Sequence, residues 1–275
     1  MSDPQALSPC AALVRRHDPD RFLTALFAPP ARREALFALY AFNHELARAR
    51  EVVSEPMLAL IRLQWWREVV QGAAKRHEVA TPLSAAIAQG LLLPDDLMAM
   101  IDGREAEADP AIPDHAAWLA YLAATAGGVM VAAGRALGAQ GALLDRLRTL
   151  GTAHGVAGQL RNVPALARAG RVLLPQDVLG AHGLTIHDMT AGRQATGLLA
   201  VVAELAAEGR AMLGDAGGLP RSVPRAVSRS VPRALIAAAL PAVLARRDLA
   251  RPPRIAPRGL GDRLAVLAAW ARGRV

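Results

Sequence analysis

Residues 36–51 read LFALYAFNHELARARE, and they are the most informative stretch of this 275-residue chain. Apolar and aromatic side chains recur there at intervals of three and four residues, the spacing that places them on one face of an α-helix. The residues that follow this spacing are Leu36, Leu39, Tyr40, Asn43 and Leu46. We therefore expect one long helix over residues 32–53, with one face buried in a helical core.

The composition extends this expectation to the whole chain. Hydrophobic residues make up 53% of the sequence and aromatics only 4%, so the apolar content is mainly Ala, Leu and Val. Ala and Leu are strong helix formers. The sequence has no stretch in which apolar and polar residues alternate, the pattern typical of a half-buried β-strand. Proline and glycine separate the helical segments. Pro164 is expected to end one of them at Asn162, and Pro232 or Pro241 is expected to kink the helix over 223–245. The expected helices cover residues 18–27, 32–53, 54–74, 94–107, 115–137, 143–162, 192–213, 223–245 and 260–272, with short helices opening at Thr81, Asp177 and Thr185.

The cysteine content and the N-terminus bear on the compartment. Cys10 is the single cysteine, which favours a reducing, intracellular environment. Residues 1–20 carry several charges and no apolar segment of the kind a signal peptide needs. No run of about 18 apolar residues is expected to span a bilayer. We therefore expect a cytoplasmic protein.

The positive charge is concentrated near the C-terminus. The formal net charge is +8, and residues 221–275 hold twelve arginines but only two acids, Asp248 and Asp262. Such a surface could face anionic lipid, a pyrophosphate, an acidic protein or nucleic acid. Lys75 is the only lysine, so this chain uses Arg wherever a positive surface charge is needed. A solubilising surface therefore explains the cluster of arginines equally well. The arginines at 221–233 are not interleaved with aromatics, so nucleic-acid binding is not expected.

Four further strings carry a resemblance to a known family. They are residues 61–67 (IRLQWWR), 121–129 (YLAATAGGV), 155–166 (GVAGQLRNVPAL) and 170–175 (GRVLLP). Together with residues 36–51, and in this order, they resemble the squalene/phytoene synthases. The resemblance implies a single-domain, all-α isoprenoid synthase fold over residues 1–275, a helical bundle around a central cavity, with basic C-terminal helices in 221–275.

Enzymes of this family depend on two aspartate-rich motifs on facing helices. Carboxylates at positions i and i+4 project from one helix face, and two such pairs hold Mg²⁺ ions that help a prenyl diphosphate to lose pyrophosphate. The first motif aligns with residues 47–51, where Ala47, Arg48 and Glu51 leave one acid. The second aligns with residues 162–166, where Asn162 and Leu166 leave none. We interpret both motifs as degenerate, with no catalytic residue and no metal.

Because these acids are missing, the functional hypotheses include a protein without catalytic activity. The chain looks most similar to a branch of the superfamily that contains a mitochondrial assembly factor of respiratory complex I. That resemblance implies a non-catalytic role in complex I assembly at the inner membrane, with complex I subunits or assembly intermediates as partners. Two alternatives stay open: a prenyltransferase that joins two prenyl diphosphates head to head and uses Mg²⁺, and a catalytically inactive protein that binds an isoprenoid or an anionic membrane surface.

Several polar residues could line the cavity that this fold implies. They are Tyr40, Asn43, Thr125, Gln159, Asn162 and Arg171. Arg48 and Arg50 are two residues apart on one helix, so only one of them can point inward. Acidic residues at 102–109 are interpreted as a solvated helix end, and Tyr40 could equally be an ordinary core residue. Histidines and cysteine are not clustered, so zinc is not expected.

Overall fold

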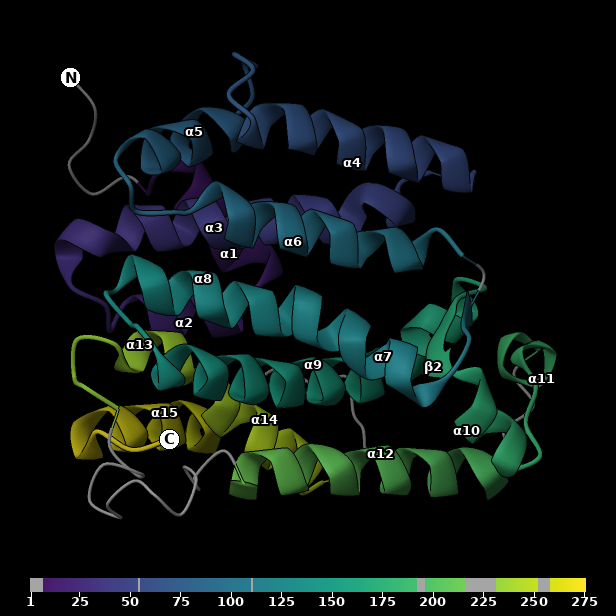
Figure 1. Cartoon of the computed structure of the whole chain (residues 1–275). Coiled ribbons are helices and arrows are strands. Elements are labelled where there is room, and N and C mark those ends of the chain that lie inside the picture. The colour runs from purple at the N-terminus through teal and green to yellow at the C-terminus, as the bar shows by residue number, and fades with distance from the viewer. Residues whose placement is uncertain (1–6, 54, 110, 192–195, 216–230, 252–257) are drawn as a thin grey trace.

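The computed structural model describes residues 7–53, 55–109, 111–191, 196–215, 231–251 and 258–275. These residues form roughly parallel and antiparallel helices stacked in layers (Figure 1). The helices are α1 Pro9–His17, α2 Pro19–Ala25, α3 Pro30–Glu51, α4 Pro56–Val70, α5 Ala80–Ala88, α6 Pro94–Arg104, α7 His115–Leu122, α8 Gly128–Ala136, α9 Ala142–Arg168, α10 Gln176–Ala181, α11 Ile186–Thr190, α12 Thr196–Asp215, α13 Ile236–Ala239, α14 Pro241–Leu249 and α15 Leu260–Arg272. A 3₁₀ turn, η1, covers Glu105–Glu107, and a π-helical segment, η2 (Ala123–Gly127), joins α7 to α8.

The layers place α3 and α9 deep in the bundle. In Figure 1, α4 and α5 lie at one edge and α12, α14 and α15 at the other. Helix α9 packs against η2, α8, α12 and α14, and α3 packs against α1, α4, α5 and α8. The buried apolar side chains form one continuous cluster that runs from Cys10 to Ala269. The all-α helical bundle predicted from the sequence is confirmed.

Proline and capping residues set where many helices begin. Proline occupies the first helical position of α1, α2, α3, α4, α6 and α14, where its missing N–H removes no helical hydrogen bond. The Asp114 carboxylate accepts a hydrogen bond from the backbone N–H of Ala117 and caps α7. These local signals explain why most helix starts follow from the sequence.

Helix α9 contradicts the predicted break at Pro164. The helix continues to Arg168, and Pro164 lies on its exposed face. A proline inside a helix leaves the carbonyl four residues earlier without its usual N–H donor. Here that carbonyl belongs to Leu160, which is buried, and the packing of α9 against η2, α8, α12 and α14 holds the helix together past the proline. The helix predicted over 223–245 is interrupted at Pro241, one of its two expected kinks, where α13 ends and α14 begins; its described part is helical only from Ile236, and residues 223–230 lie outside the described residues.

Two short strands were not expected. Ala111–Ile112 (β1) and Val172–Pro175 (β2) pair in parallel at one end of the bundle. Trp118 on α7 is fully buried, and its Nε1–H donates to the Leu173 carbonyl at 3.1 Å. This bond holds β2, and the chain just before it, against α7.

The continuous segment α7–η2–α8 bears on the expectation that no segment of the chain is apolar enough to span a bilayer. Within residues His115–Ala136, the most apolar 18-residue window has a mean hydropathy of 1.6, so this segment is long and apolar enough to cross a membrane by length and composition. However, 61% of its most apolar window is buried inside the bundle. A core helix passes the same test of length and composition, and this segment packs against α6 and α9.

The contact between η2 and α9 depends on a glycine. A Cβ atom at Gly151 would lie 2.7 Å from the Ala126 carbonyl oxygen and 2.7 Å from the Gly127 Cα. Both neighbours are backbone atoms, so the helices would have to move apart.

We expect Gly151→Ala to lower the free energy of unfolding by about 1–3 kcal/mol, because overpacking outweighs the better helix propensity of alanine. Urea denaturation measures the change. The matched control is Gly158→Ala on the same helix, where an added Cβ meets no atom within 4 Å. That variant should be neutral or more stable, by up to about 1 kcal/mol. Equal effects of the two variants would contradict this account of the contact.

Candidate functional site

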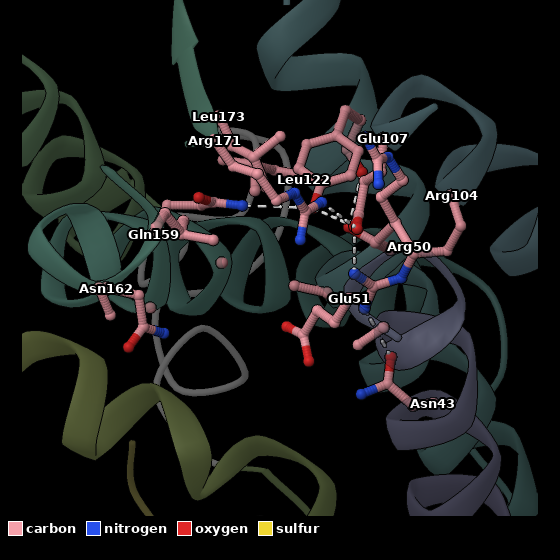
Figure 2. Close-up of a pocket in the computed structure, with 18 of the residues that line it drawn as sticks. Asn43, Arg50, Glu51, Arg104, Glu107, Leu122, Gln159, Asn162, Arg171 and Leu173 are labelled. Carbon is pink, nitrogen blue, oxygen red and sulfur yellow. Dashed lines mark hydrogen bonds and ion pairs between the residues drawn. The ribbon is translucent and has the colours of Figure 1, made fainter. Parts of the chain in front are cut away.

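A cavity of about 780 Å³ lies between α3, η2 and α9 (Figure 2). Of the residues singled out from the sequence, most line it: Asn43, Ala47, Glu51, Thr125, Gln159, Asn162, Leu166 and Arg171. The two degenerate motifs therefore face the same space from opposite helices. Sequence reasoning missed Arg21, Arg104, Glu107, Tyr121 and His154, which line it as well.

The centre of the polar wall is Glu107 from η1, which is 4% exposed. Its Oε1 accepts a hydrogen bond from Tyr121 Oη at 2.7 Å and is paired with Arg104 Nη1. Its Oε2 accepts from Arg171 Nη2 at 3.0 Å. Gln159 Nε2 then donates to Tyr121 Oη at 3.2 Å. One carboxylate thus joins groups from α6, α7, α9 and the segment before β2, as the dashed lines in Figure 2 show.

These partners keep Glu107 ionised. Burial alone would raise the pKa of its carboxyl, but the charge of Arg104, the hydrogen bonds and the charge of Arg171 together hold the pKa below its ordinary value. Burial and the neighbouring Glu107 charge raise the pKa of Tyr121, so its hydroxyl stays protonated and can donate. Two arginines surround one acid, and the network as a whole is positively charged.

Glu107 corrects the interpretation of residues 102–109 as a solvated helix end. Asp102 and Glu105 are exposed and pair with Arg67 at 2.6 Å, as that interpretation expected. Glu107 instead turns inward. Its partners Tyr121 and Arg171 are distant in sequence, so only the tertiary structure shows the difference.

Of Arg48 and Arg50, only one faces the cavity, as their spacing on the helix requires. The Arg48 side chain is 42% exposed and lies 3.5 Å from Glu45 Oε1, outside the cavity. Arg50 lines the cavity, and its Nη1 donates to the Val53 carbonyl at 2.8 Å. The first degenerate motif therefore contributes one arginine to the cavity, but it is Arg50 rather than Arg48.

Tyr40 also differs from its predicted place in the cavity. It is 1% exposed in the core and does not belong to the cavity lining. The Arg21 guanidinium carbon lies 5.8 Å from the centroid of its ring. Tyr40 lies on the same side of α3 as Asn43 and Ala47 but one and two turns earlier, beyond the part of the helix that lines the cavity, which explains the correction.

The cavity does not fit the Mg²⁺ ions that the family resemblance implies. Mg²⁺ takes hard oxygen ligands, chiefly carboxylates and water. Only Glu51 and Glu107 supply carboxylates to the lining, and Arg104, Arg171 and Tyr121 already engage Glu107. Figure 2 shows the Glu51 carboxylate pointing into the cavity on its own, and the described residues contain no group of three or more potential His, Cys, Asp or Glu metal ligands.

The lining nevertheless contains more cationic than anionic side chains. Arg21, Arg50, Arg104 and Arg171 supply four guanidinium groups against two carboxylates. Within the described residues, Arg104 Nε, His154 Nδ1 and Gln159 Oε1 are buried without a hydrogen-bond partner. Burial and the charge of Arg21 lower the pKa of His154 to about 4, so its ring is neutral at pH 7. This chemistry suits an anionic or strongly polar group more than a cation.

Helices that face one another across a cavity are the arrangement that the resemblance to isoprenoid synthases implies. A sequence model of the squalene/phytoene synthase family matches residues 14–266, and the chain belongs to that family. Two solved structures share the fold. A dehydrosqualene synthase has a TM-score of 0.74 at 16% identity and covers 96% of this chain and 94% of its own. The squalene synthase HpnC from Alicyclobacillus acidocaldarius has a TM-score of 0.68 at 20% identity, with coverage of 88% and 90%.

Curated relatives of higher identity carry a different description. The chain is 30% identical over 221 residues to NADH dehydrogenase (ubiquinone) complex I, assembly factor 6, from Bos taurus, and 28% identical to the Homo sapiens protein of that name. A homolog from Drosophila melanogaster is 26% identical over 187 residues. The matches to the cattle and human proteins cover 78% of this chain and 66% of the relatives, so the chain spans just under two thirds of their length.

Proposed function

We propose that this protein acts in the assembly of respiratory complex I at the inner membrane, without prenyl diphosphate chemistry. The observation that carries the proposal is that the ionised Glu107 of the cavity is already paired with Arg104 and Arg171 and so is not free to bind a metal ion. An arginine near a metal position repels the cation, by about 4 kcal/mol for unit charges at 4 Å and an effective dielectric constant near 20. The similarity to assembly factor 6 supports the same function.

Such a protein would use its fold for contacts rather than for turnover. Its partners would be complex I subunits or assembly intermediates, and it would work from the cytoplasmic side of the membrane. A chain that keeps the family's bundle and loses its metal ligands fits this role, because surfaces and shape do not depend on the metal.

A deletion strain tests the function. We expect lower NADH:quinone oxidoreductase activity and less assembled complex I on native gels, with unchanged terpenoids. Succinate:quinone oxidoreductase activity is the internal control, and a plasmid copy of the wild-type gene should restore complex I. Normal complex I in the deletion strain would reject the proposal.

The retained cavity favours a second candidate, the binding of an isoprenoid or lipid with an anionic head group. Its volume of about 780 Å³ and its four arginines suit such a ligand, because guanidinium groups bind phosphate without a metal. Calorimetric titration with farnesyl diphosphate in the presence of EDTA tests this candidate. Binding that Arg171→Met weakens would support it, and no heat of binding would reject it.

A further inference from the structure

The C-terminal helix α15 carries a stripe of exposed leucines. Leu260, Leu264 and Leu267 are 73%, 53% and 46% exposed. Their spacing of four and then three residues places them on one helix face. Large apolar side chains arranged in this way on a surface mark a contact site more often than isolated ones do. We call these three residues the leucine stripe.

The leucine stripe is not the face by which α15 joins the bundle. Asp262, Val266 and Ala269 lie on the opposite face and are buried. Asp262 Oδ1 accepts from Arg247 Nε of α14 at 2.6 Å, and the ring of Trp270 lies 5.3 Å from that of Phe27. The helix is therefore already fixed to the protein by one face, and the leucines are on the other.

The charge around the leucine stripe is positive. Arg263, Arg272 and Arg274 are exposed on or directly after α15. In the described part of the chain from residue 231 onward, Asp248 and Asp262 are the only acidic side chains, and both are in ion pairs with arginines. Residues 231–251 and 258–275 thus combine exposed leucines with cations, and within these ranges neither acidic side chain is unpaired.

We propose that α15 lies on an anionic lipid bilayer, with the leucine stripe among the acyl chains and the flanking arginines at the head groups. Helices with an apolar face and a basic rim bind at this interface, and the arginines select anionic over neutral lipid. The inference deepens the proposed function, because an assembly factor for a membrane complex works at the bilayer. It places the lipid-facing side opposite α4 (Figure 1).

The test is sedimentation of the full-length protein with two kinds of vesicle, pure phosphatidylcholine and phosphatidylcholine with 30% phosphatidylglycerol. We expect binding to the anionic vesicles only, weakened by added NaCl. The double variant Leu264→Glu/Leu267→Glu should bind at least about tenfold more weakly, because it replaces apolar contact with repulsion. Arg263→Ser and Arg272→Ser should each weaken binding about fivefold.

A matched control is Met57→Glu/Ile61→Glu on α4, whose side chains are 63% and 58% exposed. It makes the same change of charge on the far side of the bundle and should bind as the wild type does. Thermal unfolding should be the same for all variants, since the substituted side chains are exposed.

Equal binding to both vesicles, or unchanged binding of the leucine variant, would overturn the proposal. So would wild-type self-association that the leucine variant abolishes while lipid binding is absent, because the stripe would then join two copies of the chain. The assay measures lipid alone. Normal complex I in a deletion strain would therefore reject the proposed function without affecting the lipid-binding result. A failure to bind anionic vesicles would likewise reject the lipid contact without affecting the proposed function.

Discussion

Glu107→Gln should lower the free energy of unfolding by about 3–5 kcal/mol, because removing one partner of a buried ion pair leaves the other charges uncompensated. Arg104 and Arg171 would lose their counter-charge, and their side chains are only 13% and 14% exposed. Glutamine keeps the shape and can still accept a hydrogen bond from Tyr121, so the loss reports mainly on charge.

Urea denaturation of the wild type and of Glu107→Gln measures this effect. The control is Glu105→Gln on the same turn, where the carboxylate is 49% exposed and pairs with Arg67. Exposed ion pairs contribute about 0–1 kcal/mol, so this control should change little. Similar losses for both variants would show that Glu107 is an ordinary surface acid.

The same network predicts a pH dependence. The pKa of Glu107 is lowered in the folded protein from an ordinary value of 4.5. Its contribution to stability is therefore complete above about pH 5 and is lost as the pH falls below 4.5 through the folded value. The gap in unfolding free energy between wild type and Glu107→Gln should be constant at neutral pH and narrow below pH 4.5. A gap that widens in acid would contradict the assigned charge state.

Trp118→Ala should also destabilise the protein by about 3–5 kcal/mol, the range typical for removing a large buried aromatic side chain. Trp118 is 0% exposed and bonds to the Leu173 carbonyl, so the variant loses packing and a hydrogen bond together. Trp118→Phe keeps most of the packing and should cost less, about 1–3 kcal/mol, for the carbonyl left without its donor.

Chemical denaturation, followed by far-UV circular dichroism, measures both Trp118 variants. The control is Trp65→Phe, since Trp65 is only partly buried and lies on a surface groove with Ile61 and His77. We expect a change below about 1 kcal/mol there. If Trp118→Ala is no more harmful than this control, Trp118 does not hold β2 and the Arg171 segment in place.

The order of the helices could be predicted because its signals are local. The apolar spacing over residues 36–46 and the prolines at helix starts act within one or two turns. Pro164 shows where such rules fail. Whether α9 continues past Pro164 depends on its contacts with neighbouring helices, which are a property of the packed bundle and not of the adjacent sequence.

For the cavity too, local sequence signals predicted some residues, and others depended on tertiary packing. Each motif contributes part of its residues to the lining, because only one side of a helix faces the cavity: Ala47, Arg50 and Glu51 from the first, and Asn162, Ala165 and Leu166 from the second. Glu107 was missed because a cluster of acids in sequence looks the same whether it is solvated or paired. The signal that could have found it is the combination of Tyr121 and Arg171, two polar residues inside the strings shared with the family, which need a buried partner.

The loss of metal chemistry is tested most directly by incubating the purified chain with farnesyl diphosphate and Mg²⁺ and measuring pyrophosphate release. An active squalene synthase assayed in parallel serves as the positive control. We predict no release above the rate without protein, and no Mg²⁺ binding by calorimetry. Release of pyrophosphate that depends on both the protein and Mg²⁺ would contradict the account, because the cavity would then hold metal ions despite Arg104 and Arg171.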